Sequence, residues 1–251
     1  AGDFNAAVVS KCTNPTVTPP SWIPAKKQPS GATDTWVVMD PNFAETGKVY
    51  VGTSGAESAF SVSTDRAISF NQLSLIDTAL NVMVDFDAVS TTTLLLLTRN
   101  SNTNIESLWL TTDGGSSWQR ILVSGQAVNG QAVQDLTGVE AVSESTILAI
   151  DATNNVIWKT DDSGATWLRL PMSMIPAGAN ISAVEAVDAD TFFMGTTIGR
   201  IYKVTVLEAG AMDWTEAVIS GNPVIHSIAL SPNYAEDKTV LVGTGNGQVW
   251  I

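Results

Sequence analysis

Three carboxylates occupy the same place in successive repeats of a strand pattern, and they are the side chains best placed for chemistry. Asp87, Glu140 and Glu185 each lie in the first of four short apolar runs. Two carboxylates about 6.5–9.5 Å apart can hydrolyse a glycosidic bond with inversion, and three can raise one another's pKa values or bind Ca²⁺. The simpler interpretation, which we adopt, is that they face a water-filled channel and keep its mouth soluble.

The other reactive side chains lack the partners that catalysis needs. His226 is the only histidine and Cys12 the only cysteine. A hydrolytic triad on His226 needs a nucleophile, but no Gly-x-Ser-x-Gly sequence occurs, and a closed zinc site needs several His or Cys ligands. We therefore expect no zinc site and a structural role for His226. We expect Cys12 to be an unpaired thiol, with pairing between molecules as the alternative.

A repeat supplies the elements that position these residues. Five aromatic residues recur at intervals of 47 to 49 residues, and three of them close a motif with a central Asp at 63–70, 111–118 and 160–167, of which the first copy is degenerate. The segment 138–170 contains four short runs rich in β-branched and aromatic residues, separated by turn formers, which predicts four strands. The five recurring aromatic residues are Trp22, Phe70, Trp118, Trp167 and Trp214.

Four strands per repeat of this length predict an all-β, five-bladed β-propeller of four-stranded antiparallel blades, because a single sheet cannot bury both of its faces. We expect the blades at about 36–75, 80–123, 136–172, 181–220 and 224–251, forming one propeller over 21–251. Residues 1–20 read as an extended tail. The last repeat stops after its third strand, and 21–28 lies where a fourth strand would belong.

The segment 21–28 is therefore predicted to complete the last blade. We expect closure within one chain, because effective concentration favours the intramolecular partner and a closed ring leaves no exposed edge. Two alternatives stay open. Residues 21–25 could pair with the last blade of a neighbouring copy, giving a homo-oligomer or filament by strand donation. The chain could also be a piece of a longer propeller.

The sequence Ser/Thr-x-Asp-x-Gly-x-Ser/Thr-Trp at this period resembles the Asp-box, or BNR, repeat. That repeat occurs in sialidases, xyloglucan-degrading hydrolases, sortilin-like receptors and photosystem II assembly factors of the Ycf48 type. A sialidase would need an arginine triad and an Arg-Ile-Pro sequence, and this chain does not supply them, so it looks more like non-catalytic bacterial surface, Ycf48-like or sortilin-like propellers. The resemblance implies a structural role for Asp65, Asp113, Gly115, Trp118, Asp162, Gly164 and Trp167.

Composition limits the function classes. The chain of 251 residues has a net charge of −13, 44% hydrophobic and 15% charged residues, which disfavours nucleic acid and anionic membranes as partners. No apolar run is long enough to span a membrane as a helix. We expect an extracellular or cell-surface location, with the periplasm as an alternative. The start at Ala1 fits a mature form after signal cleavage, or a cloned fragment.

The expected function is that of a non-catalytic structural or binding module for a protein or a glycan. Two loops in the first and last repeats share the sequence Pro-Asn-Phe/Tyr-Ala-Glu, and we expect Asn42, Phe43, Asn233 and Tyr234 to contact a partner or, as the alternative, to tuck beneath their own loops. No cofactor is expected apart from the Ca²⁺ considered above. The alternative function is a glycoside hydrolase that uses the channel carboxylates.

Overall fold

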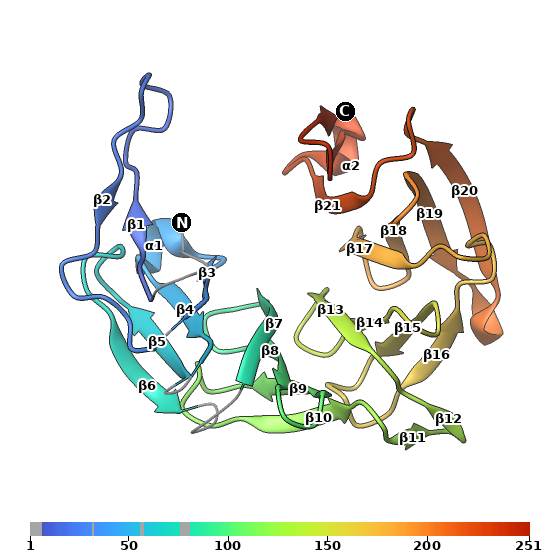
Figure 1. Cartoon of the computed structure of the whole chain (residues 1–251), viewed down its shortest axis with the longest axis horizontal. Coiled ribbons are helices and arrows are strands. Elements are labelled where there is room, and N and C mark those ends of the chain that lie inside the picture. The colour runs from blue at the N-terminus through green and yellow to red at the C-terminus, as the bar shows by residue number, and fades with distance from the viewer. Residues whose placement is uncertain (1–6, 32, 56–57, 76–80) are drawn as a thin grey trace. The chain divides into compact units, whose positions relative to one another are not determined.

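The computed structural model describes residues 7–31, 33–55, 58–75 and 81–251, whose regular secondary structure is almost entirely antiparallel β-sheet (Figure 1). The chain divides into two compact units, Ala1–Val123 and Ser124–Ile251. The first six residues of the expected tail lie outside the described part of the chain.

The first unit contains two four-stranded sheets, each a meander in chain order. The first sheet consists of β3 (Thr35–Met39), β4 (Val49–Thr53), β5 (Ala59–Ser63) and β6 (Asn71–Leu75). The second consists of β7 (Asn81–Ala88), β8 (Leu94–Asn100), β9 (Ile105–Thr111) and β10 (Gln119–Val123).

The second unit contains three more sheets of the same kind. The third is β13 (Leu136–Ala141), β14 (Ile147–Asp151), β15 (Val156–Thr160) and β16 (Leu168–Pro171). The fourth is β17 (Ile181–Ala186), β18 (Thr191–Thr196), β19 (Arg200–Val206) and β20 (Met212–Val218), with the short 3-10 helix η1 (Glu208–Gly210). The last is β21 (Ile225–Leu230), β22 (Val240–Thr244) and β23 (Val249–Trp250), and a hairpin of β11 (Ala127–Val128) and β12 (Gln131–Ala132) precedes the third sheet. The predicted five-bladed propeller of antiparallel blades is confirmed.

Stacking of neighbouring sheets forms the cores within each unit. In the first unit, Tyr50 and Phe60 of the first sheet pack against Phe86, Leu94 and Leu96 of the second. Two similar clusters join the third sheet to the fourth and the fourth to the last. Strands covered on both faces read as continuous apolar runs, which explains the four consecutive leucines of β8.

The recurring aromatic residues lie at or near the start of each fourth strand. Phe70 and Trp167 are buried, and the ring of Trp118 meets the ring of Phe60 edge to face at 5.2 Å between centroids. Trp214 meets Tyr202 in the same way at 5.8 Å. Trp22 differs, because 53% of its surface is exposed.

The segment before the first sheet packs against that sheet. Strand β1 (Ser10–Lys11) pairs with β2 (Ile23–Pro24), Val9 is buried beside Val49, and the backbone N–H of Phe70 donates to the carbonyl of Lys27 at 3.1 Å. The last sheet has three strands in the described part of the chain. Its completion by residues 21–28 therefore stays a prediction.

The two loops with a shared sequence both contain a single helical turn, which sequence patterns did not predict. Helix α1 (Phe43–Thr46) joins β3 to β4, and α2 (Tyr234–Asp237) joins β21 to β22. Each helix ends at a residue with positive φ, Gly47 in one and Lys238 in the other. Both loops therefore lie in the first hairpin of their sheet.

Gly115→Ala should destabilise the first unit strongly. Gly115 has a φ of +93°, and an added Cβ would overlap the ring of Phe60. The control Gly130→Ala also has a positive φ, +76°, but its Cβ would meet no atom within 4 Å. We expect the control to lose about 1 kcal/mol from backbone strain and Gly115→Ala to lose roughly 1–3 kcal/mol more from overpacking. Thermal denaturation followed by circular dichroism checks this, and equal losses would contradict the packing argument.

Candidate functional site

The three motif turns have one hydrogen-bond pattern. In each, an Asp Oδ1 accepts from a Ser or Thr hydroxyl two residues earlier at 2.7–2.8 Å and from the backbone N–H four residues later at 2.8–2.9 Å. The Oδ2 atom accepts from the side-chain hydroxyl of that later residue at 2.6–2.7 Å. The three aspartates are Asp65, Asp113 and Asp162, so each carboxylate is engaged by its own turn.

The degenerate first turn keeps this geometry although it lacks the motif glycine. Ala67 adopts a φ of 58° where Gly115 and Gly164 have 93° and 87°. The N–H of Ala67 donates to the hydroxyl of Ser63 at 2.9 Å, as the N–H of Gly115 does to Thr111. Its Asp and two hydroxyl residues therefore suffice to form the turn at the cost of a strained alanine.

The donated hydrogen bonds stabilise the charged form of these aspartates. The side-chain hydroxyl of Ser117 contributes most to lowering the pKa of Asp113 to about 2, and that of Thr166 does the same for Asp162. The hydroxyl of Ser69 likewise lowers the pKa of Asp65. A carboxylate held ionised in this way is a poor proton donor near neutral pH.

The first-strand carboxylates occupy equivalent register positions, but backbone groups engage them. Asp87 pairs with Leu95, Glu140 with Leu148 and Glu185 with Phe193. Asp87 Oδ1 accepts from the N–H of the next residue at 2.7 Å.

The two glutamates each reach the first strand of the following sheet. Glu140 Oε1 accepts from the N–H of Ala186, and Glu185 Oε1 from the N–H of Leu230, both at 3.2 Å. Within the residues that the structure describes, no group of three or more His, Cys, Asp and Glu side chains is arranged to hold a metal ion. These carboxylates therefore have an architectural contact that the sequence did not reveal.

The two loop aromatics are half-buried, while Asn42 and Asn233 are exposed. The guanidinium of Arg66 lies 5.3 Å from the centroid of the Phe43 ring. Tyr234 meets the ring of Phe193 edge to face at 5.9 Å, and the ammonium of Lys238 lies 5.2 Å from its centroid. Both aromatics thus pack partly against other elements of their own unit, and their contact with a partner stays a prediction.

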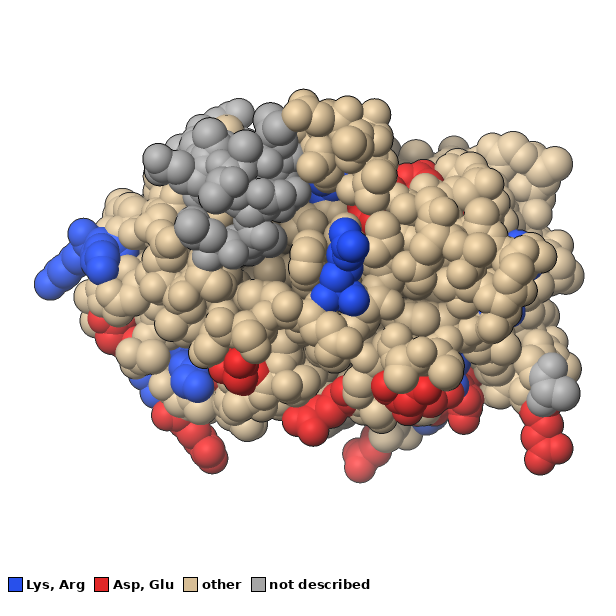
Figure 2. All heavy atoms as spheres, turned by 90° about the horizontal axis from the view of Figure 1, so that it is seen from below, with Lys and Arg blue, Asp and Glu red and all other residues tan. Residues whose placement is uncertain are grey.

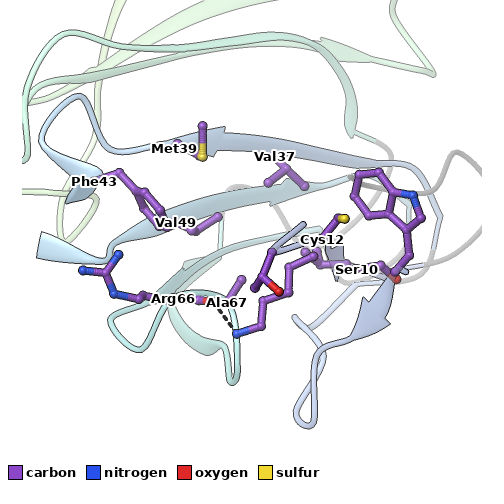
Figure 3. Close-up of a pocket in the computed structure, with 12 residues that line it drawn as sticks. Ser10, Cys12, Val37, Met39, Phe43, Val49, Arg66 and Ala67 are labelled. Carbon is purple, nitrogen blue, oxygen red and sulfur yellow. Dashed lines mark hydrogen bonds between the residues drawn. The ribbon is translucent and has the colours of Figure 1, made fainter. Parts of the chain in front are cut away.

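A cavity of about 530 Å³ lies between the N-terminal segment and the first sheet (Figure 3). One wall comes from residues 9–13 and Trp22, and the other from β3, α1, β4 and the first motif turn. Most of the lining is apolar, and Figure 3 shows Val37, Met39, Phe43 and Val49 along one side with Cys12 opposite.

Among the described residues, two cations and no carboxylate line this cavity. The ammonium of Lys11 donates to the carbonyl of Arg66 at 2.8 Å, and the guanidinium of Arg66 donates to the carbonyl of Ala44 at 2.8 Å. Elsewhere acidic groups predominate, and Figure 2 shows them along the lower edge of the face drawn, with basic side chains scattered singly. The cavity therefore combines apolar walls with a local positive charge in an acidic protein.

Sequence patterns did not predict this cavity, because one of its walls comes from a segment without periodicity. The signal for that wall was Trp22, which keeps the phase of the recurring aromatics but precedes the first complete repeat. A separate regularity of the sheets, an aromatic residue in each third strand, was also overlooked. These residues are Phe60, Trp109, Trp158, Tyr202 and Trp250.

Several solved structures share the fold. The chain aligns with YCF48 bound to D1 peptide at 14% identity and a TM-score of 0.54, covering 86% of this chain and 65% of that one. It aligns with the GH74 enzyme of Niastella koreensis at 16% identity and a TM-score of 0.67, covering 97% and 38%. It also aligns with the GH74 xyloglucanase of Xanthomonas campestris at 18% identity and a TM-score of 0.57, covering 83% of this chain and 34% of that one.

At these identities the likeness establishes the propeller fold alone. The chain spans less than two thirds of the length of each of these structures. No protein-family model matches the sequence, and no curated protein matches it, so the Asp-box assignment remains a resemblance. Among the described residues, no helix is long and apolar enough to cross a membrane.

Asp162→Asn should lower the free energy of unfolding at neutral pH, and it should make that free energy depend less on pH in the acid range. The pKa of Asp162 is lowered to about 2 in the folded chain, so its contribution is fully present above about pH 4 and is lost as the pH falls through about 2. The variant cannot lose that charge, and its denaturation midpoint should change less with pH in this range. Urea titrations from about pH 2 to 7 check this. The exposed Asp188→Asn, outside the motif turns, serves as control, and identical pH profiles of Asp162→Asn and wild type would contradict the assignment.

Proposed function

We propose that this chain is a non-catalytic binding module whose first-sheet cavity takes an apolar segment of a protein partner. The observation that carries the proposal is the cavity of about 530 Å³ with apolar walls, Trp22 and Met39 being 53% and 62% exposed. Pockets of about 300–1,000 Å³ with mainly apolar linings are typical ligand sites. Burial of these two side chains by a partner removes a large apolar surface from water.

The charges beside the cavity favour a partner with acidic residues next to its apolar side chains. Lys11 and Arg66 line the cavity, and the part of its lining that the structure describes contains no acidic side chain. Charge complementarity of this kind speeds encounter and fixes register more than it adds affinity. The partner that fits is an extended segment with two or three large apolar side chains flanked by Asp or Glu.

The contacts of the carboxylates favour binding over hydrolysis. Glu140 and Glu185 accept hydrogen bonds from backbone N–H groups of the next sheet, and a general acid needs a proton and access to the substrate. YCF48 and GH74 enzymes share this fold, so fold alone does not separate the two classes. The low content of charged residues, 15%, supports an extracellular or cell-surface location for the module.

Met39→Asp should weaken binding of an apolar, acid-flanked peptide roughly tenfold, because a charge would be desolvated against the cavity wall. Met39 is 62% exposed, so folding should survive. A panel of nine-residue peptides with central Leu or Phe and flanking Glu, measured by fluorescence anisotropy, supplies the probe. The control Met174→Asp changes an exposed methionine, 53%, that is outside the cavity lining.

Two outcomes would contradict the proposal. One is that no peptide of the panel binds, or that both methionine variants bind as wild type does. The other is hydrolysis of a xyloglucan or another soluble glycan by the chain, lost in Glu140→Gln, which would establish the hydrolase alternative.

A second candidate function is assembly of copies by strand donation through residues 21–25. Trp22 and Ile23 are exposed where the corresponding aromatics of the other sheets are at least partly buried, and Val249 of β23 is 70% exposed. The indole N–H of Trp250 is buried without an acceptor in the described part of the chain. A donated strand would supply backbone partners to the free edge of β23.

Ile23→Asp and Val249→Asp should each lower self-association, because each places a charge in the donated pairing. Sedimentation velocity over a range of concentrations measures the effect. Val218→Asp, at a 55% exposed position of the complete fourth sheet, should associate as wild type does. A wild-type chain that stays monomeric, or donor and acceptor variants that associate normally, would refute strand donation. Ile23 and Val249 are not part of the cavity lining, so the two candidate functions are tested separately.

A further inference from the structure

A second pocket, of about 300 Å³, lies at the end of the second sheet where a hairpin joins β8 to β9. Alternation along the strands places Thr98 and Asn100 of β8 on the same face as Ile105, Ser107 and Trp109 of β9. These side chains, with Arg120 of β10, line the pocket. Its lining is mainly polar, unlike that of the first-sheet cavity, and it lies at the lower end of the usual range of ligand pockets.

Arg120 carries the one charge among the described residues of this lining. Its guanidinium lies 5.8 Å from the centroid of the Trp109 ring, and among the described residues it makes no hydrogen bond or ion pair. A guanidinium held over an indole keeps its donors in a fixed plane, which matches the geometry of a carboxylate. The pocket therefore offers an anion site in a chain whose net charge is −13.

The rest of the lining offers neutral hydrogen-bonding groups. Asn100 Oδ1 accepts from the N–H groups of Asn102 and Thr103 at 2.9 and 3.2 Å, which fixes the amide and leaves its NH₂ group as a donor. The hydroxyl of Ser107 makes no hydrogen bond within the described part of the chain. Thr98 Oγ1 accepts from the indole N–H of Trp109 at 3.0 Å, which fixes the orientation of the ring.

The third sheet contains the same cross-strand pair with a buried acidic neighbour. Trp158 pairs with Arg169 as Trp109 pairs with Arg120. Asp151 stands at the register position of Thr98, accepts from the indole N–H of Trp158 at 3.2 Å, and is fully buried, as Trp158 is. The N–H of Gln134 also donates to Asp151. The Trp–Arg pair is thus part of the repeat, and the open polar pocket belongs to the second sheet.

We propose that this pocket binds a carboxylated sugar unit, a uronic acid or a similar acidic monosaccharide. The carboxylate pairs with Arg120, the ring hydroxyls exchange hydrogen bonds with Asn100 and Ser107, and the apolar face of the ring packs on Trp109 and Ile105. A carboxylate alone would use only the arginine, and a neutral sugar would leave the guanidinium without an anion. This site shares no lining residue with the first-sheet cavity. The proposal therefore stands or fails independently of the peptide-binding experiments.

Methyl β-D-glucuronide is the probe, with methyl β-D-glucoside and acetate as matched ligands. Titration into the full chain, followed by ¹H–¹⁵N correlation spectra, should shift the indole N–H signal of Trp109, which Trp109→Phe identifies by its loss. We expect Arg120→Gln to weaken binding of the glucuronide about tenfold or more, because a charge-assisted pair is lost. Arg169→Gln, the same substitution in the closed third-sheet pair, should leave the affinity unchanged.

Three results would overturn the proposal. The first is that the glucuronide leaves the Trp109 signal unmoved. The second is that acetate or the glucoside binds as tightly as the glucuronide, because the pocket would then recognise only one half of the ligand. The third is that Arg120→Gln and Arg169→Gln have the same effect. Circular dichroism of both variants ensures that folded proteins are compared.

Discussion

Each sheet has two apolar faces, and the need to cover both governs the rest of the structure. Leu94 to Leu97 are all fully buried although they alternate between the faces of β8, so this strand is covered on both sides. The first sheet is covered on one face by the second sheet and on the other, in part, by Val9 and Ala25. The cavity lies where this second cover is incomplete. The cavity proposed above as a binding site therefore arises from incomplete packing over the first sheet.

Polar contacts at the strand ends connect sheets that apolar packing alone would leave free to slide. Glu140 and Glu185 accept from the next sheet's backbone. The hydroxyl of Tyr50 lies 2.6 Å from Asp40 Oδ2 and 3.0 Å from the carbonyl of Thr91 in the second sheet, and burial, with this hydrogen bond, raises its pKa. Buried polar groups need such partners, so the hydrogen bonds of Glu140 and Glu185 help to hold neighbouring sheets in place.

Sequence patterns predicted the sheets and turns that recur in each repeat, but they did not predict contacts that occur only once in the chain. The period of the aromatics and the central Asp of the motif predicted five sheets and their turns, because each repeat must solve the same burial problem. The register of Asp87, Glu140 and Glu185 was also predicted, but their backbone partners were not. Val9 meets the first sheet through contacts that no local pattern encodes. Likewise Phe43 contacts Arg66 of the first motif turn, and Tyr234 contacts Phe193 of β18. Both partners lie outside the loops that carry these aromatics.

Departures from the repeat are therefore the places where specificity can arise. The third-strand aromatics Trp109, Trp158 and Tyr202 illustrate this, since they share one register position while their neighbours differ. Next to the ring of Trp158, the buried side chain of Asp151 fills the position that Thr98 occupies in the second sheet. The hydroxyl of Tyr202 lies within hydrogen-bonding distance of Glu216. Next to Trp109 the smaller Thr98 leaves the pocket open. Arg120 lies over the ring and makes no hydrogen bond or ion pair within the described residues. The same strand position thus has a closed core contact in the third sheet, a hydrogen-bond network in the fourth and an open pocket in the second. The residue next to the ring decides which of these forms.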